Sequence, residues 1–493
     1  MQRKPTPFLC IKGSISEDEI MAGKVHENIV LMIIVIGTLM AAIDTTIVLL
    51  AFPAMTAALH SNISVMIWVI LIYIIVAAVL STQFGRIGDI YGRSRMFNLG
   101  FAIFTVASFL CGLAQTDVTL IIFRAVQAVG GALLASNSAA IIADTFERHR
   151  IGRAYGFVAM SWNIGALLGI LLGGVITTFL SYRYIFFINV PIGIIAVVLG
   201  LKYIKDNARI KEQIDVAGMF LLGAAIALIS YSGINYASVG LTATGFMLFI
   251  IGIAAGAGFI IVERREKMPM VNLGMFKNKI FRNSLLASLF QGLGFMGVTF
   301  LLIMYLQGVR GFTPLVASAL LFPGYIISGI FAPLMGRRSD KHGSRIIATV
   351  GIFFMIIGTL FYFFFLGVSS SIYYVIIGTM ITGFGGAMFW PSNSSAIMAN
   401  VKDELRGVAS GTFRLFSNMG LIGSFVIAFV AAASSIPRSL AFEIFVGTSK
   451  VIGGVSNGFV SGMHAAFLVL IIMLIFAGIF SFARGREERS KKM

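Results

Sequence analysis

Long apolar runs separated by short polar segments dominate the chain from about residue 29 onward. We find fourteen such runs, at 29–52, 65–84, 97–114, 118–142, 154–177, 184–201, 216–234, 241–262, 283–306, 314–335, 346–367, 372–398, 407–433 and 463–483. A helix needs about 20 mostly apolar residues to cross the hydrocarbon core of a bilayer, so each run predicts one membrane-spanning helix. The first run follows 28 mostly polar residues and has no small-residue cleavage site. This predicts a retained helix and not a signal peptide.

Composition supports the same fold class. Hydrophobic residues make up 58% of the chain and charged residues 12%, whereas soluble domains carry about 25% charged residues. A water-soluble globule and a disordered chain are both excluded. We therefore expect an all-α polytopic membrane protein.

The net charge of +17 has an uneven distribution along the chain. If the N-terminus is inside, 31 of the 37 Lys and Arg residues fall in cytoplasmic segments. This bias follows the positive-inside rule and predicts a multi-pass protein of the plasma membrane with both termini cytoplasmic. Contact with the anionic inner leaflet explains the basic pI without a nucleic-acid partner.

Three segments of the first half recur in the second half in the same order. GRIGDIYGRSR at 85–95 returns as GRRSDKHGSR at 336–345, GGALLASNSAA at 130–140 returns as GGAMFWPSNSSA at 385–396, and GRAYGFVAMSWNIG at 152–165 returns as GVASGTFRLFSNMG at 407–420. The offsets of 251, 255 and 255 residues predict two parallel six-helix units, a common arrangement in transporters that rock around a midplane site.

The repeat defines the expected domain organisation. It consists of a cytoplasmic segment (1–28), an N-terminal six-helix bundle (29–201), two inserted transmembrane helices with flanking loops (202–282), a C-terminal six-helix bundle (283–484) and a cytoplasmic tail (485–493).

The first recurring segment predicts a conformational latch. Gly85 and Gly88 allow close helix contact, and Gly92 permits a tight turn. The carboxylate of the segment is placed to meet a helix N-terminus or a basic neighbour. Such a loop would hold the inner ends of two helices together in one state. The alternative is a plain cytoplasmic turn whose charges only set topology. The candidate residues are Gly85, Asp89, Gly92 and Arg93, with Gly336, Asp340 and Gly343 in the second half.

Span 5 contains small residues at helical spacing. Gly165, Gly169 and Gly173 fall on one face, and Gly174 widens the groove to one side. This pattern favours close packing of two helix backbones.

Only three charges lie well inside the predicted spans: Asp44, Arg124 and Arg414. Charges in hydrocarbon cost about 2.5–3.5 kcal/mol on insertion scales, so each marks a functional site by default. Asp44 and Arg124 lie at similar depth, which predicts a coupled pair that Gln127 joins one turn away. An acid tuned in this way suits proton coupling. A permanent ion pair that only fixes helix packing is the alternative.

Three further polar positions have two interpretations each. Asn137 and Asn393, in the recurring SNS segments, line a cavity or hydrogen-bond between helices. Arg414 marks an anionic substrate group or bonds a backbone carbonyl.

These segments together resemble the major facilitator superfamily and, within it, the 14-spanner drug:proton antiporter family. Residues 85–95 match the superfamily loop motif. Arg124, Gln127 and Gly130 match the R-x2-Q-x2-G pattern of span 4. The segment DTTIVLLAFP (44–53) resembles the signature of span 1, and YRYIFFINVPIG (182–193) resembles that of span 6. Span 5 matches the antiporter motif except that Ile170 replaces the usual proline.

The resemblance implies a secondary transporter that exports lipophilic or cationic compounds against a proton gradient, without enzyme chemistry or a cofactor. It assigns Asp44 as the coupling or substrate carboxylate and Arg124 as its partner. Ile170 leaves the direction of coupling open. The expected partners are a small-molecule substrate, protons and the bilayer, and we expect a monomer.

Two alternatives remain. One is a metabolite uniporter or symporter of the same fold, and the other, more remote, is a non-transporting membrane sensor. The sequence has no phosphate-binding loop of the kind that ATP-driven pumps use. Its five histidines are scattered without metal-ligand spacing.

Overall fold

The structure, a computed structural model, describes residues 17–146, 148–204, 214–266, 269–401, 405–434 and 454–485. Within these residues, fourteen helices are long and apolar enough to cross a membrane. Each coincides with a predicted run to within seven residues at either end; the run predicted over 184–201, for example, is the span Tyr184–Tyr203. The predicted all-α, fourteen-span fold is confirmed.

The described helices follow the order of the spans. The first unit contains α1 (Glu17–Ala58), α2 (Ile63–Met66), α3 (Trp68–Tyr91), α4 (Arg93–Leu113), α5 (Asp117–Thr145), α6 (Arg148–Phe179), α7 (Tyr184–Phe187) and α8 (Asn189–Tyr203). Then come α9 (Val216–Val239), α10 (Ala243–Arg265) and the 3-10 turn η1 (Leu273–Lys277). The second unit contains α11 (Lys279–Met304), the π-helical turn η2 (Tyr305–Val309), α12 (Pro314–His342), α13 (Ser344–Phe365), α14 (Tyr373–Ala399), α15 (Arg406–Ser434) and α17 (Gly454–Ala483).

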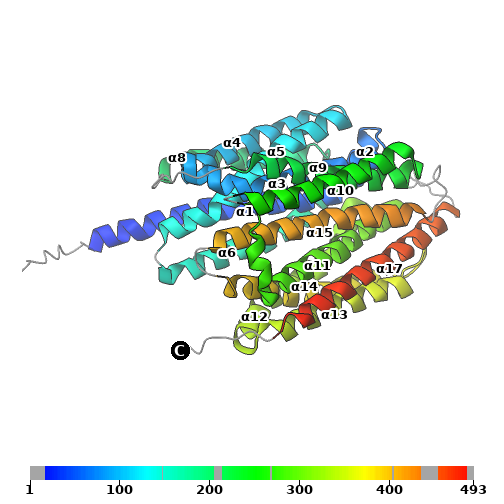
Figure 1. Cartoon of the computed structure of the whole chain (residues 1–493). Coiled ribbons are helices and arrows are strands. Elements are labelled where there is room, and N and C mark those ends of the chain that lie inside the picture. Colours follow the sequence, from blue (N-terminus) through cyan, green and yellow to red (C-terminus); the bar gives the residue numbers. More distant parts are fainter. Residues whose placement is uncertain are drawn as a thin grey trace, which may run out of the picture.

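The two units pack their helices in the same way. In the first unit α1 packs on α6, α4 on α5, and α3 on α5. In the second unit α11 packs on α15, α13 on α14, and α12 on α14. The repeat in the sequence is therefore a repeat of two parallel six-helix bundles, and the beginning of α1 and the end of α17 lie on one side of the molecule (Figure 1). We call this side the terminal side.

The inserted helices lie beside the seam between the bundles. Helix α9 packs on α3 of the first bundle and on α15 of the second. Helix α10 packs mainly on α9, and its spanning window is only 11% buried (Figure 1). Its apolar surface therefore faces lipid, because water could not solvate it.

The recurring loops end one helix and begin the next through a glycine. Gly92 separates α3 from α4 with a φ of 111°, and Gly343 separates α12 from α13 with a φ of 93°. Residues with a side chain avoid this backbone region. Both loops therefore need a glycine for the same reason, namely a positive φ at this position.

Hydrogen bonds join the two bundles on the side opposite the chain ends, whereas α6 of the first bundle is largely exposed on the terminal side. Away from the terminal side, the Gln307 side-chain amide donates to the Leu50 carbonyl at 3.0 Å, and the Leu315 N–H donates to the Thr178 hydroxyl at 3.0 Å. On the terminal side, most of α6 between residues 153 and 164 is exposed, including Trp162 at 48%. The first bundle is therefore open along α6 on the terminal side, while α3 and α15 stay in contact.

The glycines of α6 face two different helices, α1 and α12. A Cβ on Gly165 would lie 2.7 Å from the Ala42 Cβ, and one on Gly169 would overlap the Thr46 side chain, so both face α1. Gly173 also faces α1, near Ile47. Gly174 instead faces α12 of the other bundle, where a Cβ would lie 2.9 Å from the Pro314 carbonyl oxygen.

We predict that Gly169→Ala separates α1 from α6 and lowers stability by about 1–3 kcal/mol, as overpacking usually does. The measurement is the thermal unfolding midpoint in detergent. Gly156→Ala is the matched control, because it changes the same helix where a Cβ would meet nothing within 4 Å. Equal midpoints for the two variants would contradict the close α1–α6 contact.

Candidate functional site

Asp44 of α1 lies at the centre of a buried polar network in the first bundle. It has no exposed surface, and neither has Gln127. Arg124 of α5 donates from Nη1 to Asp44 Oδ2 at 2.6 Å, and Gln127 donates from Nε2 to Asp44 Oδ1 at 2.9 Å. Asn189 of α8 donates to the same Oδ1 at 3.3 Å. The predicted contact of Asp44, Arg124 and Gln127 is present.

Arg124 has further partners that do not depend on Asp44. Its Nε donates to the Val69 carbonyl of α3 at 3.1 Å, and its Nη1 donates to Gln127 Oε1 at 2.6 Å. Its guanidinium lies over the Tyr73 ring, 4.3 Å from the centroid. A cation over an aromatic face is attracted by the ring quadrupole. The guanidinium is therefore held by α3 and α5 whatever the state of the acid.

The network joins five helices of one bundle. Asp44 comes from α1, Val69 and Tyr73 from α3, Arg124 and Gln127 from α5, and Asn189 from α8. Ser108 of α4 accepts from Gln127 Nε2 at 2.8 Å. A change at the carboxylate therefore acts directly on the packing of almost the whole first bundle.

Among the described residues, the second bundle has no charge pair at the positions that match Asp44 and Arg124. Gly420 packs on Leu289 as Gly165 packs on Leu39, so Asp44 corresponds to Gly294. By the same repeat, Arg124 corresponds to Thr379. The chemistry of the buried charge pair thus belongs to the first bundle.

The latch candidates are only partly brought together. Arg93 donates to Asp89 at 2.5 Å and to both carboxylate oxygens of Asp144 at 2.7 Å, which ties the terminal ends of α3, α4 and α5. A Cβ on Gly85 would meet nothing within 4 Å, so our expectation of a close helix contact there is wrong. Gly88 makes that contact instead, against Asn137.

In the second half, contacts are described for fewer of the latch candidates. The terminal end of α12 contains Gly336, near Pro391, and Gly343 ends the helix. The side chain of Asp340 lies outside the part of the chain that the structure describes.

Asn137 and Asn393 are both fully buried. Asn137 donates to the Leu133 carbonyl of its own helix at 2.9 Å and to the Phe84 carbonyl of α3 at 3.3 Å. Asn393 donates to the Ser288 hydroxyl of α11 at 2.7 Å and accepts from Arg484. In this conformation neither lines a cavity, and both hydrogen-bond between helices, the second of the two interpretations.

Arg414 is partly exposed on α15. Among the residues that the structure describes, none accepts a hydrogen bond from its guanidinium or forms an ion pair with it. The interpretation that it bonds a backbone carbonyl is therefore not supported in this conformation.

Sequence reasoning missed four members of the network: the Val69 carbonyl, Tyr73, Ser108 and Asn189. Asn189 lies in the segment of span 6 (182–193) that resembles the family signature. That resemblance marked the segment but assigned Asn189 no role. The other three lie on spans whose rotation about their axes the sequence does not reveal.

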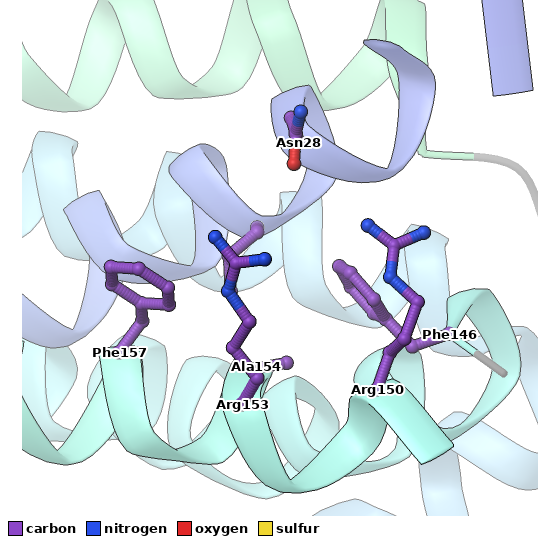
Figure 2. Close-up of a pocket in the computed structure, with 7 residues that line it drawn as sticks. Asn28, Phe146, Arg150, Arg153, Ala154 and Phe157 are labelled. Atoms are coloured by element: carbon purple, nitrogen blue, oxygen red, sulfur yellow. The ribbon is translucent and has the colours of Figure 1, made fainter. Parts of the chain in front are cut away.

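A small cavity lies at the terminal side, away from the Asp44 network. It has a volume of about 100 Å³ and lies between α1 and α6, where Arg150 and Arg153 extend toward Asn28 (Figure 2). Arg150 also forms an ion pair with Glu27. Ligand pockets commonly measure about 300–1,000 Å³, so this cavity is too small to be the transport site.

Comparison with known proteins identifies a family match over most of the chain. The family model described as Major Facilitator Superfamily matches residues 34–425 and 285–492. Riboflavin transporter RibZ of Clostridioides difficile is 31% identical over 420 residues, which cover 84% of this chain and 89% of the relative. Multidrug resistance protein 3 of Bacillus subtilis is 29% identical, covering 82% of this chain and 79% of the relative.

Solved structures show the same fold at low sequence identity. A bacterial homolog of the human lysosomal transporter Spinster, inward-facing and unoccupied, aligns with a TM-score of 0.63 at 15% identity over 94% of this chain and 97% of that one. A D-xylose–proton symporter also aligns with a TM-score of 0.63, at 13% identity over 92% of this chain and 97% of that one.

We predict that Arg124→Met lowers stability by about 3–5 kcal/mol, because it leaves the Asp44 carboxylate buried without a counter-charge. The double variant Asp44→Leu, Arg124→Met should recover most of that loss, because no charge remains buried. Thermal unfolding in detergent measures both. A double variant no more stable than Arg124→Met would show that the pair's charges do not set the cost.

Proposed function

The chain belongs to the major facilitator superfamily, within its 14-spanner drug antiporter family, and from that premise we propose that it exports small organic compounds in exchange for protons. It is a multi-pass membrane protein and not an enzyme. The proposed location is the plasma membrane, with the terminal side facing the cytoplasm. One observation carries the proposal: the acid placed deepest in the described spans, Asp44, is directly bonded to Arg124.

Protonation of Asp44 would change the network without dismantling it. The ion pair is neutral as it stands, and a proton on the carboxylate would leave the charge of Arg124 uncompensated. The Val69 carbonyl, Gln127 and the Tyr73 ring remain as its partners. A buried cation without a counter-ion is costly, so the protonated network favours a conformation in which Arg124 is better solvated. This dependence is what couples a proton to a conformational change.

The arrangement of the bundles supports alternating access. They touch through Leu50 and Gln307 on one side and expose α6 on the other. Asp44 is sealed from water in this open-inside conformation, so proton exchange requires the opposite conformation or a brief opening of the network.

A metabolite transporter is the second candidate, favoured by the 31% identity to a riboflavin transporter. The replacement of the motif proline by Ile170, a buried residue, also leaves the direction of coupling to be measured. Both candidates use the same fold and the same acid, and they differ in substrate and in direction.

We predict that Asp44→Asn abolishes substrate-dependent proton movement, because an amide cannot carry the proton. The protein is reconstituted in proteoliposomes that contain a pH-sensitive dye, and proton flux is recorded upon addition of substrate. Ethidium, flavins and fluoroquinolones form a starting panel of substrates. Retained coupling in Asp44→Asn would refute the role given to the acid.

Asp117→Asn is the matched control, because it removes an acid at the start of α5 outside the network. The variant Arg124→Ala distinguishes a role of the ion pair in proton coupling from a role in helix packing alone. A loss confined to protein yield, with normal turnover per molecule, would show that the pair only fixes helix packing.

A further inference from the structure

The charges deep in the described spans do not balance. Asp44, Arg124 and Arg414 are the charged residues that lie well away from the helix ends. The first two neutralise each other at 2.6 Å. One positive charge remains, on Arg414 of the second bundle.

Arg414 lies on the face of α15 between the faces that meet α3 of the first bundle and α11 of the second. One face of α15 meets α3, where a Cβ on Gly411 would lie 3.4 Å from Thr82. Another face meets α11, where the Gly297 N–H donates to the Ser424 hydroxyl at 2.7 Å. At 3.6 residues per turn, Arg414 falls between these two contacts.

The opposite side of α15 is occupied by a different contact. Phe416 packs against Phe276 of η1, with ring centroids 5.8 Å apart. Because Phe416 and Arg414 point to nearly opposite sides of the helix, the guanidinium is turned away from η1. Its side chain is partly exposed.

Aromatic side chains lie beside this position. Phe413, the preceding residue, contacts Trp390 of α14 with ring centroids 6.3 Å apart. Trp390 keeps 38% of its surface exposed. Arg414 lies about two helical turns from the start of α15 at Arg406, and Trp390 about as far from the end of α14 at Ala399. Both therefore lie in the terminal third of the span.

We propose that Arg414 binds the acidic group of an organic anion, with the exposed Trp390 as the flat apolar surface beside it. This assignment rests on the proposed transport function and specifies its substrate class as aromatic or other apolar compounds with a carboxylate, sulfonate or phosphate group. A planar guanidinium donates two parallel hydrogen bonds to such groups. The anion supplies the counter-charge that the described residues do not.

A cationic substrate does not fit the same charges. Both carboxylate oxygens of Asp44 already accept hydrogen bonds, and the remaining deep charge, on Arg414, is positive. The family resemblance led us to expect export of cations. A cationic substrate would find a free carboxylate at Asp44 only if Asp44 left Arg124.

The test compares three probes that share one ring system: anthracene-9-carboxylate, 9-anthracenemethanol and 9-(aminomethyl)anthracene. Their binding to the purified full chain in detergent is measured by equilibrium dialysis at pH 7.5. The carboxylate should bind the wild type about tenfold more tightly than the alcohol, as one hydrogen bond to a charged group allows. Arg414→Gln should remove that difference, and Arg414→Lys should retain part of it.

Arg153→Gln is the matched control, because it removes the same charge from an exposed position on α6 and should leave the preference unchanged. Equal binding of the carboxylate and the alcohol to the wild type, or an unchanged preference in Arg414→Gln, would overturn the proposal. The assay uses no proton gradient. A wild type without an anion preference but with intact proton coupling would therefore refute this inference alone. A wild type with the preference, combined with coupling retained in Asp44→Asn, would refute only the coupling role of Asp44.

Where Arg414→Gln does not elute as a single species, tryptophan fluorescence carries the test. The carboxylate should quench the wild type at lower concentration than the alcohol does, and Trp390→Phe should lose most of that quenching. Quenching that persists in Trp390→Phe would place the probe elsewhere and overturn the assignment.

Discussion

The buried pair of Asp44 and Arg124 is the constraint around which the first bundle is organised. Neither charge has a route to water in this conformation, and each would be costly to bury alone. Their contact therefore requires α1 and α5 to keep one relative position. Gln127, Asn189 and Ser108 extend that requirement to α4 and α8. A protein that needed only rigidity would be served as well by apolar residues of similar volume.

The second bundle shows the contrast. It repeats the helix packing of the first but replaces the pair with Gly294 and Thr379, so it has no comparable electrostatic reason to respond to a proton. Its own deep charge, Arg414, has no matching acid. On our proposals, one fold duplicated along the chain thus serves two different roles: proton coupling in the first half and recognition of an acidic group in the second.

The inserted helices pack along the seam between the two bundles. Helix α9 packs on α3 and α15, the helices through which the two bundles meet on that side. At the terminal end, the Asp215 N–H donates to Gln83 of α3 at 3.3 Å, and Arg86 donates to the Pro269 carbonyl at 2.7 Å. These bonds join the insertion to the loop that carries the latch motif. The insertion is therefore placed to follow movement of the first bundle.

The sequence by itself determined the number, order and approximate ends of the spans, because hydrocarbon thickness fixes the length of an apolar helix. It also determined the parallel repeat, the glycine turns at Gly92 and Gly343, and the pairing of Asp44 with Arg124, since two charges at one depth in a membrane have few other partners. Only the tertiary structure decided how each helix is rotated about its axis. That rotation turns Asn137 and Asn393 into helix contacts, directs Gly174 to the other bundle, adds Tyr73 and Asn189 to the network and leaves Arg414 partly exposed between the faces of α15 that meet α3 and α11. Spans that are apolar on nearly every face do not encode their rotation, because lipid and protein neighbours favour the same side chains.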